Sequence, residues 1–132
     1  MFELTINNNI YPLNFGFGFI REIDPKITRK IDGVNGKVEQ LGLQYAIAGI
    51  IDGNFEDLVD VIATANKYAD GDRLTRSDIE KHLENPETDV DALFEMVIDF
   101  LSRANCTKKT VANLQEAIKA EKAKQAAQNE QK

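Results

Sequence analysis

The sequence predicts a mostly α-helical protein, a single domain of about six helices with an N-terminal β-hairpin. Three observations lead to this prediction. Two short runs of β-forming residues open the chain, apolar residues then recur at helical spacing along most of its length, and glycines, prolines and capping residues divide that stretch. A chain of 132 residues is long enough for one domain to bury a hydrophobic core.

The hairpin is predicted from two β-forming runs, residues 2–6 and 10–15. The asparagines at positions 7–9 between them tolerate the positive backbone φ angles of a tight turn. A two-stranded hairpin is marginally stable alone in water, so its apolar face should pack on the helices or on another protein. That face has three side chains: Phe2, Leu4 and Ile6.

Two short helical segments should follow the hairpin. Apolar residues at helical spacing predict a helix from about Phe17 that ends before Asp24, because the residue before a proline is pushed out of the helical region. We expect Asp24 to act as a cap and residues 25–31 to form one more short turn. A loop is then expected at two glycines: Gly33 and Gly36.

Residues 38–52 have almost no polar face, which predicts a central, buried helix. Gly42 and Gly49 within it each lower helix stability by about 1 kcal/mol relative to alanine, but they allow a neighbouring backbone to approach closely. Gly53 and Asn54 should end this helix and cap the next one. The next helix carries an apolar stripe: Phe55, Leu58, Val59, Ile62 and Ala65.

A capping box marks the start of the following helix. Thr75 and Asp78 have the required spacing, and Leu74 and Ile79 flank them as a hydrophobic staple. This helix should end near Asn85, which precedes a proline.

The next helix is predicted to begin at Thr88 and to end near Ala104. Its apolar stripe is regular: Val90, Leu93, Phe94, Val97, Ile98 and Leu101. A last helix should begin between Thr107 and Thr110, with a thin stripe of three residues: Val111, Leu114 and Ile118. We therefore expect a helical domain over residues 1–118, with the hairpin at about 1–15, and a polar tail over 119–132 that is frayed or disordered.

Composition excludes several classes of function. The formal net charge is −6 and the pI is near 4.8, so the chain lacks the basic surface typical of nucleic-acid binding. No apolar run approaches the roughly 20 residues that cross a bilayer, and the N-terminus does not read as a signal peptide, so we expect a cytoplasmic protein. One cysteine and one histidine form neither an internal disulfide nor a four-ligand zinc site.

Four local patterns could carry chemistry, and each has a simpler interpretation. Residues 70–81 resemble a calcium loop but lack its glycine at the sixth position and its glutamate at the twelfth, so a capped helix start is favoured. The acids repeated along one helix favour a solvated face over a metal or acid-base site. They are Asp91, Glu95 and Asp99, with Asp89 beside them.

The single histidine, His82, and the single cysteine, Cys106, have no neighbours in sequence that would form a catalytic pair. Phe15, Phe17 and Phe19 alternate with glycines but match no nucleotide-binding motif, so we expect them to anchor the hairpin to the first helix. An exposed phenylalanine among them would instead mark a protein-binding patch. The sequence thus predicts no catalytic, cofactor-binding or metal-ligating residues and no enzyme activity.

Three segments carry a resemblance to a known family. They are residues 3–24, ELTINNNIYPLNFGFGFIREID; residues 41–65, LGLQYAIAGIIDGNFEDLVDVIATA; and residues 89–114, DVDALFEMVIDFLSRANCTKKTVANL. In the order of its predicted elements and in local sequence, the chain resembles the tail assembly chaperones of long-tailed, siphovirus-type bacteriophages. The resemblance implies a helical protein that binds the tape measure protein in the host cytoplasm, keeps it soluble and helps recruit the major tail protein. It also implies absence from the mature virion and, in many members, a longer product made by frameshifting.

No family motif identifies the surface that contacts a partner, so we predict that surface from the apolar residues of the predicted helices. The stripe of the last helix is narrow enough to be shared with a partner, and Phe17 is a second candidate. The predicted partner-binding residues are Val111, Leu114, Ile118 and Phe17. Self-association is a further possibility, and neither nucleic acid nor membrane is expected as a partner. The competing interpretations are a structural virion component such as a head-tail connector or minor tail protein, an acidic mimic of nucleic acid, and a small enzyme.

Overall fold

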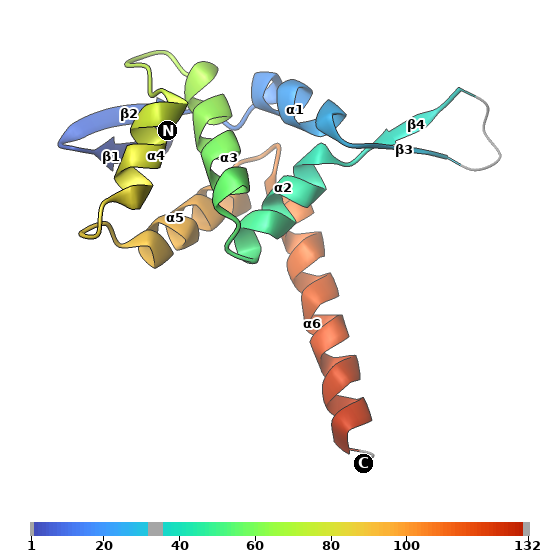
Figure 1. Ribbon diagram of the computed structural model, residues 1–132. Helices are drawn as coiled ribbons and strands as arrows, with labels where there is room; N and C mark the ends of the chain where they lie inside the picture. The colour runs from blue at the N-terminus through green and yellow to red at the C-terminus, as the bar shows by residue number, and fades with distance from the viewer. Residues whose placement is uncertain (1, 32–35, 131–132) are drawn as a thin grey trace.

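The structure is a computed structural model that describes residues 2–31 and 36–130. Within them the chain is mostly α, with six α-helices and an N-terminal antiparallel hairpin, as predicted (Figure 1). The helices are α1 (Phe17–Ile23), α2 (Gly42–Ile51), α3 (Phe55–Lys67), α4 (Arg76–Glu84), α5 (Val90–Arg103) and α6 (Lys108–Glu130). The strands are β1 (Phe2–Ile6), β2 (Asn9–Leu13), β3 (Thr28–Lys30) and β4 (Val38–Gln40), and a 3₁₀ turn, η1 (Asp24–Lys26), follows α1. The loop prediction at Gly33 lies outside the described residues.

The hairpin forms where predicted, but its turn is shorter. Asn7 and Asn8 have φ angles of 53° and 66°, the positive values of a two-residue hairpin turn, whereas Asn9 already pairs with Ile6 in the β1–β2 ladder. The prediction of a three-asparagine turn was therefore wrong by one residue, and β2 ends at Leu13 rather than at residue 15. Leu4 and Ile6 are buried and Phe2 is half-buried, so the apolar face of the hairpin packs on the helices.

The region between α1 and α2 differs from the sequence prediction. Residues 25–31 are not one turn, because β3 follows η1, and residues 38–40 are not helical, because β4 pairs with β3. Helical periodicity alone cannot detect such cross-strand pairing. The two strands form a ribbon that extends away from the helices in Figure 1. Asp24 does act as a cap, but its Oδ1 accepts from the amide of Leu43 and so caps α2 rather than its own turn.

The caps of the other helices follow local sequence. The capping box of Thr75 and Asp78 is complete, and the side chain of Asn54 caps α3 by accepting from the amide of Asp57 at 3.1 Å. The start of α5 was predicted two residues early, since the helix begins at Val90 rather than at Thr88. Asp89, not Thr88, is its N-cap, because the Asp89 side chain accepts from the amide of Ala92, whereas the Thr88 hydroxyl donates to the carbonyl of His82.

One hydrophobic core joins the hairpin to all six helices. The predicted stripes of α3 and α5 supply much of it, although Phe55 is exposed and Val90 and Ile98 are half-buried. Phe100 of α5 was not predicted as a core residue. It lies against the ring of Phe2, with 5.1 Å between centroids, and thereby connects α5 to the hairpin.

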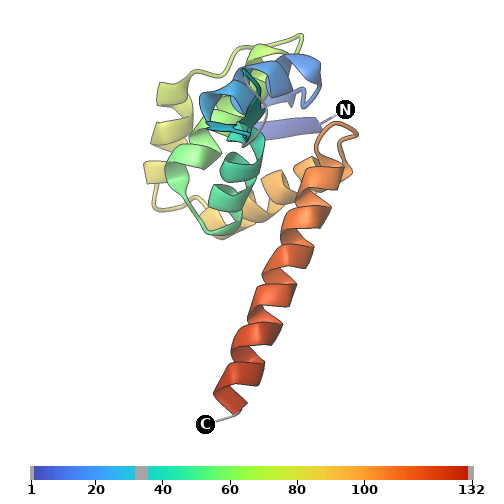
Figure 2. The same cartoon turned by 90° about the vertical axis from the view of Figure 1, so that its right-hand side faces the viewer.

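Helix α6 packs on the body only near its beginning. Val111 is 1% exposed within the core, whereas residues 119–127 are all exposed, and the rest of the helix projects away from the body (Figures 1 and 2). The structure thus continues α6 through Glu130, and the division into a domain and a tail at residue 118 stays a prediction. Among the described residues, no helix combines the length and the apolar character needed to cross a membrane.

Candidate partner-binding surfaces

The four predicted partner-binding residues lie in different environments. Val111 is buried against the body, so its side chain contributes to the core rather than to a free surface. Leu114 packs on the edge of the core, and Ile118, one turn further along α6, is half-buried. The stripe therefore becomes available to a partner only from Leu114 onward. α1 lies on the far side of the body from the projecting part of α6 in both views, so Phe17 forms a separate surface.

Phe17 is the outward member of the three alternating phenylalanines. Phe15 and Phe19 are buried as predicted, but Phe17 is 69% exposed at the first position of α1. The guanidinium of Arg21 lies 5.5 Å from the centroid of its ring. An exposed phenylalanine of this kind is a candidate contact for another protein.

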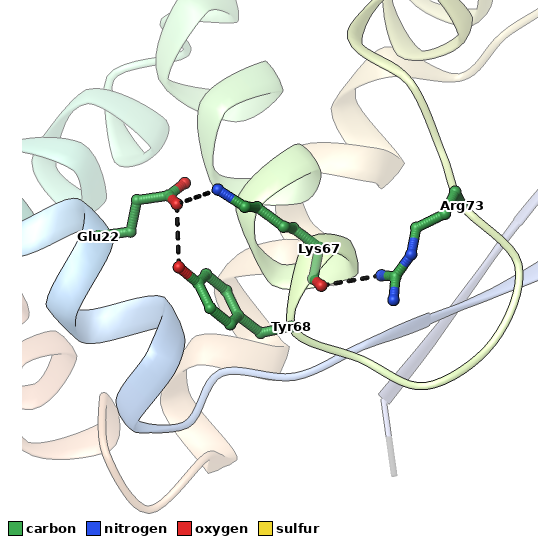
Figure 3. A network of polar contacts seen from close by, with 4 residues as sticks. All are labelled: Glu22, Lys67, Tyr68 and Arg73. Carbon is green, nitrogen blue, oxygen red and sulfur yellow. Dashed lines mark hydrogen bonds and ion pairs between the residues drawn. The ribbon is translucent and has the colours of Figure 1, made fainter.

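A polar network fixes α1 against the end of α3, and so fixes the position of Phe17 (Figure 3). The carboxylate of Glu22 accepts from the ammonium of Lys67 at 2.5 Å and from the hydroxyl of Tyr68 at 3.0 Å. The hydrogen bond from Lys67 lowers the pKa of Glu22, and the same bond raises the pKa of Lys67. Arg73 donates to the carbonyl of Lys67 from the loop after α3. Gly18 allows this arrangement, since a Cβ there would lie 2.4 Å from the ring of Tyr68.

A groove of about 410 Å³ lies between the α2–α3 connection and α5. Its apolar lining includes Phe55, which is 51% exposed and stacks edge-on against Phe94 with 5.5 Å between ring centroids. Its charged lining residues are all acids: Asp52, Asp91 and Glu95. We call this feature the acidic groove. Sequence reasoning placed Asp91 and Glu95 on a solvated face, which is correct for their exposure, but missed the groove, since residues 50–55 and 90–98 meet only in the folded chain.

A second hollow, of about 420 Å³, lies between the hairpin and the α5–α6 connection. Phe2, Phe15, Tyr68 and the half-buried Cys106 are among its lining residues. His82 lines a different hollow from Cys106, and its Nδ1 is buried without a hydrogen-bond partner among the described residues. These two side chains therefore do not form a nucleophile and base pair.

The acid row of α5 lies along the exposed face of the helix. Asp91, Glu95 and Asp99 are exposed and one turn apart, and Asp99 is paired with Arg103 at 2.8 Å. Across the part of the chain that the structure describes, no group of three or more His, Cys, Asp or Glu side chains is placed to hold a metal ion. Three exposed surfaces are candidates for contact with a partner: the outer stripe of α6, Phe17 and the acidic groove.

Comparison with models of protein families gives one match over most of the chain. Residues 3–116 match the model described as phage tail assembly chaperone protein, TAC. No curated protein and no solved structure matches the chain. The matched segment begins in β1 and ends in the third turn of α6, so it includes Phe17, the acidic groove and Leu114, whereas Ile118 lies just beyond it.

Proposed function

Because the chain belongs to the phage tail assembly chaperone family, we propose that it binds the tape measure protein, keeps that long chain soluble and promotes assembly of the tail tube. The family match over residues 3–116 is the observation that carries this proposal. A chaperone of this kind acts by binding rather than by catalysis. We further propose that it acts in the host cytoplasm, meets the major tail protein there, and is absent from the mature virion.

The surfaces described above suit this role. A tape measure protein held before assembly needs its apolar segments covered, and an amphipathic helix is commonly covered by an apolar stripe or groove on the binding protein. The projecting part of α6 offers the edge of such a stripe at Leu114 and Ile118, and α1 offers Phe17. We propose these three side chains as contacts.

Co-expression with the tape measure protein of the same phage tests the proposal. We expect the tape measure protein to move into the soluble fraction and to co-purify with this chain. Ile118→Asp and Phe17→Asp should each weaken the complex without unfolding the chaperone, because Ile118 is only half-buried and Phe17 is 69% exposed. Gln115→Asp, an exposed α6 position that adds the same charge, is the matched control.

Two results would contradict the proposal. One is a tape measure protein that stays insoluble although the chaperone is expressed and folded. The other is recovery of this chain from purified virions by mass spectrometry, which would favour the structural-component alternative. If the complex formed but neither variant weakened it, the function would stand and the contact residues would be wrong.

A further inference from the structure

The β3–β4 ribbon carries exposed isoleucines and an excess of cations. The ladder is extended at both ends by backbone hydrogen bonds, from Ile31 to Lys37 and from Leu41 to Ile27. Because alternate residues of a strand share a face, Ile27, Arg29 and Ile31 lie on the same side of the ribbon. The two isoleucines are 39% and 41% exposed. Over residues 26–40 the sequence has four cations, Lys26, Arg29, Lys30 and Lys37, against two acids, Asp32 and Glu39. Arg29 is paired with Glu39 at 2.5 Å.

The helices leave this ribbon uncovered. All three residues of β3 are exposed, and in β4 Val38 is 52% exposed. The ribbon extends away from the helices on the right of Figure 1. A two-stranded ribbon of this length is marginal by itself in water, so covering its apolar face would stabilise it.

The acidic groove is complementary to the ribbon in both charge and polarity. Its apolar lining can accept the isoleucines, and its carboxylates can pair with Lys37, which lies opposite Ile31 and so on the same side of the ribbon. Among the described residues that line the groove there is no lysine or arginine. Neither Asp91 nor Glu95 has an ion-pair partner within the described part of the chain, so both remain available to an incoming cation.

The two surfaces lie at opposite ends of α2. The ribbon leads through Leu41 into the first residue of α2, whereas the groove begins at Ile50, at the other end of the same helix. Ten helical residues span about 15 Å, and the ribbon points away from the body, so one copy cannot place its ribbon in its own groove. The partner for each surface must therefore come from another molecule.

We propose that the ribbon of one copy docks in the acidic groove of a second copy, with Ile27 and Ile31 on the apolar lining and Lys37 against Asp91 and Glu95. This contact is heterologous, since it joins two different surfaces, and each added copy leaves one ribbon and one groove open. Repetition gives an open, head-to-tail assembly rather than a closed twofold dimer. The proposal does not depend on binding of the tape measure protein.

Sedimentation velocity of the purified full chain over a concentration series tests for assembly. We expect species larger than a monomer that grow with concentration and that dissociate between about 50 mM and about 500 mM NaCl, because salt screens exposed charges. Ile31→Glu should block the ribbon and Glu95→Lys the groove, each weakening association by on the order of tenfold or more. Matched controls on the exposed face of α6 are Gln125→Glu and Glu121→Lys.

A mixture of the two blocked variants gives the decisive result. The Ile31→Glu variant keeps an intact groove and the Glu95→Lys variant keeps an intact ribbon, so an equal mixture should form a 1:1 heterodimer and nothing larger. Circular dichroism verifies that each variant is folded. If the Ile31→Glu variant is unfolded, Ile27→Glu replaces it on the ribbon, and if the Glu95→Lys variant is unfolded, Asp91→Lys replaces it in the groove. The same heterodimer is then expected.

Other outcomes would overturn the proposal. They are a wild-type chain that stays monomeric at every concentration and salt, blocked variants that assemble like wild type, and a mixture that stays monomeric. Assembly that the α6 controls abolish as strongly as the ribbon and groove variants would place the contact elsewhere. A failure here leaves the tape measure proposal intact, because that experiment measures solubility of a different protein.

Discussion

At the scale of single residues, two glycines that look alike in sequence have different neighbours. A Cβ at Gly42 would lie 1.9 Å from the carbonyl oxygen of Ile23, which is backbone, whereas a Cβ at Gly49 would lie 1.7 Å from a carboxylate oxygen of Asp57, which is the end of a side chain. We expect Gly42→Ala to destabilise the protein by about 1–3 kcal/mol, since the backbone of α1 must shift. Gly49→Ala should cost clearly less, because Asp57 can rotate away and alanine favours the helix. Urea unfolding at neutral pH measures both, and equal losses would contradict this reasoning.

The capping box at the start of α4 is a second prediction at this scale. Thr75→Ala removes the hydroxyl that accepts from the amide of Asp78, so we expect a loss of about 1 kcal/mol in the free energy of unfolding. Ser77→Ala, at the exposed second position of the same helix, is the control and should change stability little. A Thr75→Ala variant as stable as the control would show that the cap contributes nothing.

The same two cases show what local sequence can predict. The capping box was predictable because both partners lie within four residues of each other. Close packing at Gly42 was also expected, but its partner, the carbonyl of Ile23, lies 19 residues away and could not be identified. Likewise Asp24 was predicted to be a cap, and only the fold shows that it caps α2.

At the scale of elements, regular amphipathic helices were predictable and the β3–β4 ribbon was not. The stripes of α3 and α5 repeat with the helical period, and their burial follows from that pattern. The ribbon has strands of three residues, too short for an alternating pattern, and residues 38–40 continue into an apolar helix that masks them. Their structure depends on pairing across the loop, which a one-dimensional pattern does not contain.

The contact between α1 and α3 gives a pH prediction. The pKa of Glu22 is lowered from its ordinary value of 4.5, chiefly by the hydrogen bond from Lys67, so ionised Glu22 stabilises the folded state. This stabilisation is fully present above the ordinary pKa and is lost as the pH falls through the lowered value. We expect Glu22→Gln to be slightly less stable than wild type at pH 7, a small effect because the pair is partly exposed, and the difference to vanish in acid.

Thermal unfolding of wild type and Glu22→Gln across an acid to neutral pH series measures this difference. Glu84→Gln, on the exposed face of α4, is the control, since Glu84 makes no ion pair within the described part of the chain. A stability difference that stayed constant with pH would mean that Glu22 acts through packing rather than through its charge.

At the scale of the whole molecule, the candidate surfaces divide into those on one element and those between elements. The stripe of α6 and the exposed Phe17 could be proposed from sequence because each lies on a single helix, although the burial of Val111 shows that part of that stripe belongs to the core. The acidic groove could not be proposed from sequence, since it is formed by the α2–α3 connection together with α5. The net charge of the chain did not reveal the difference in charge between these two surfaces, because the total of −6 sums an acidic groove and a basic ribbon.

The extent of the folded domain leads to the last prediction. Residues 119–127 are exposed, so a chain ending at Ile118 should melt within about 2 °C of the full chain, a change worth only a fraction of a kcal/mol. The control is Val111→Ala in the full chain, which removes buried methyl groups and should cost about 1–3 kcal/mol. Differential scanning calorimetry measures both. A large loss on truncation would mean that the projecting part of α6 supports the fold. If the truncated chain is stable and still solubilises the tape measure protein, the contact surface lies within residues 1–118, and Leu114, Ile118 and Phe17 remain its candidates.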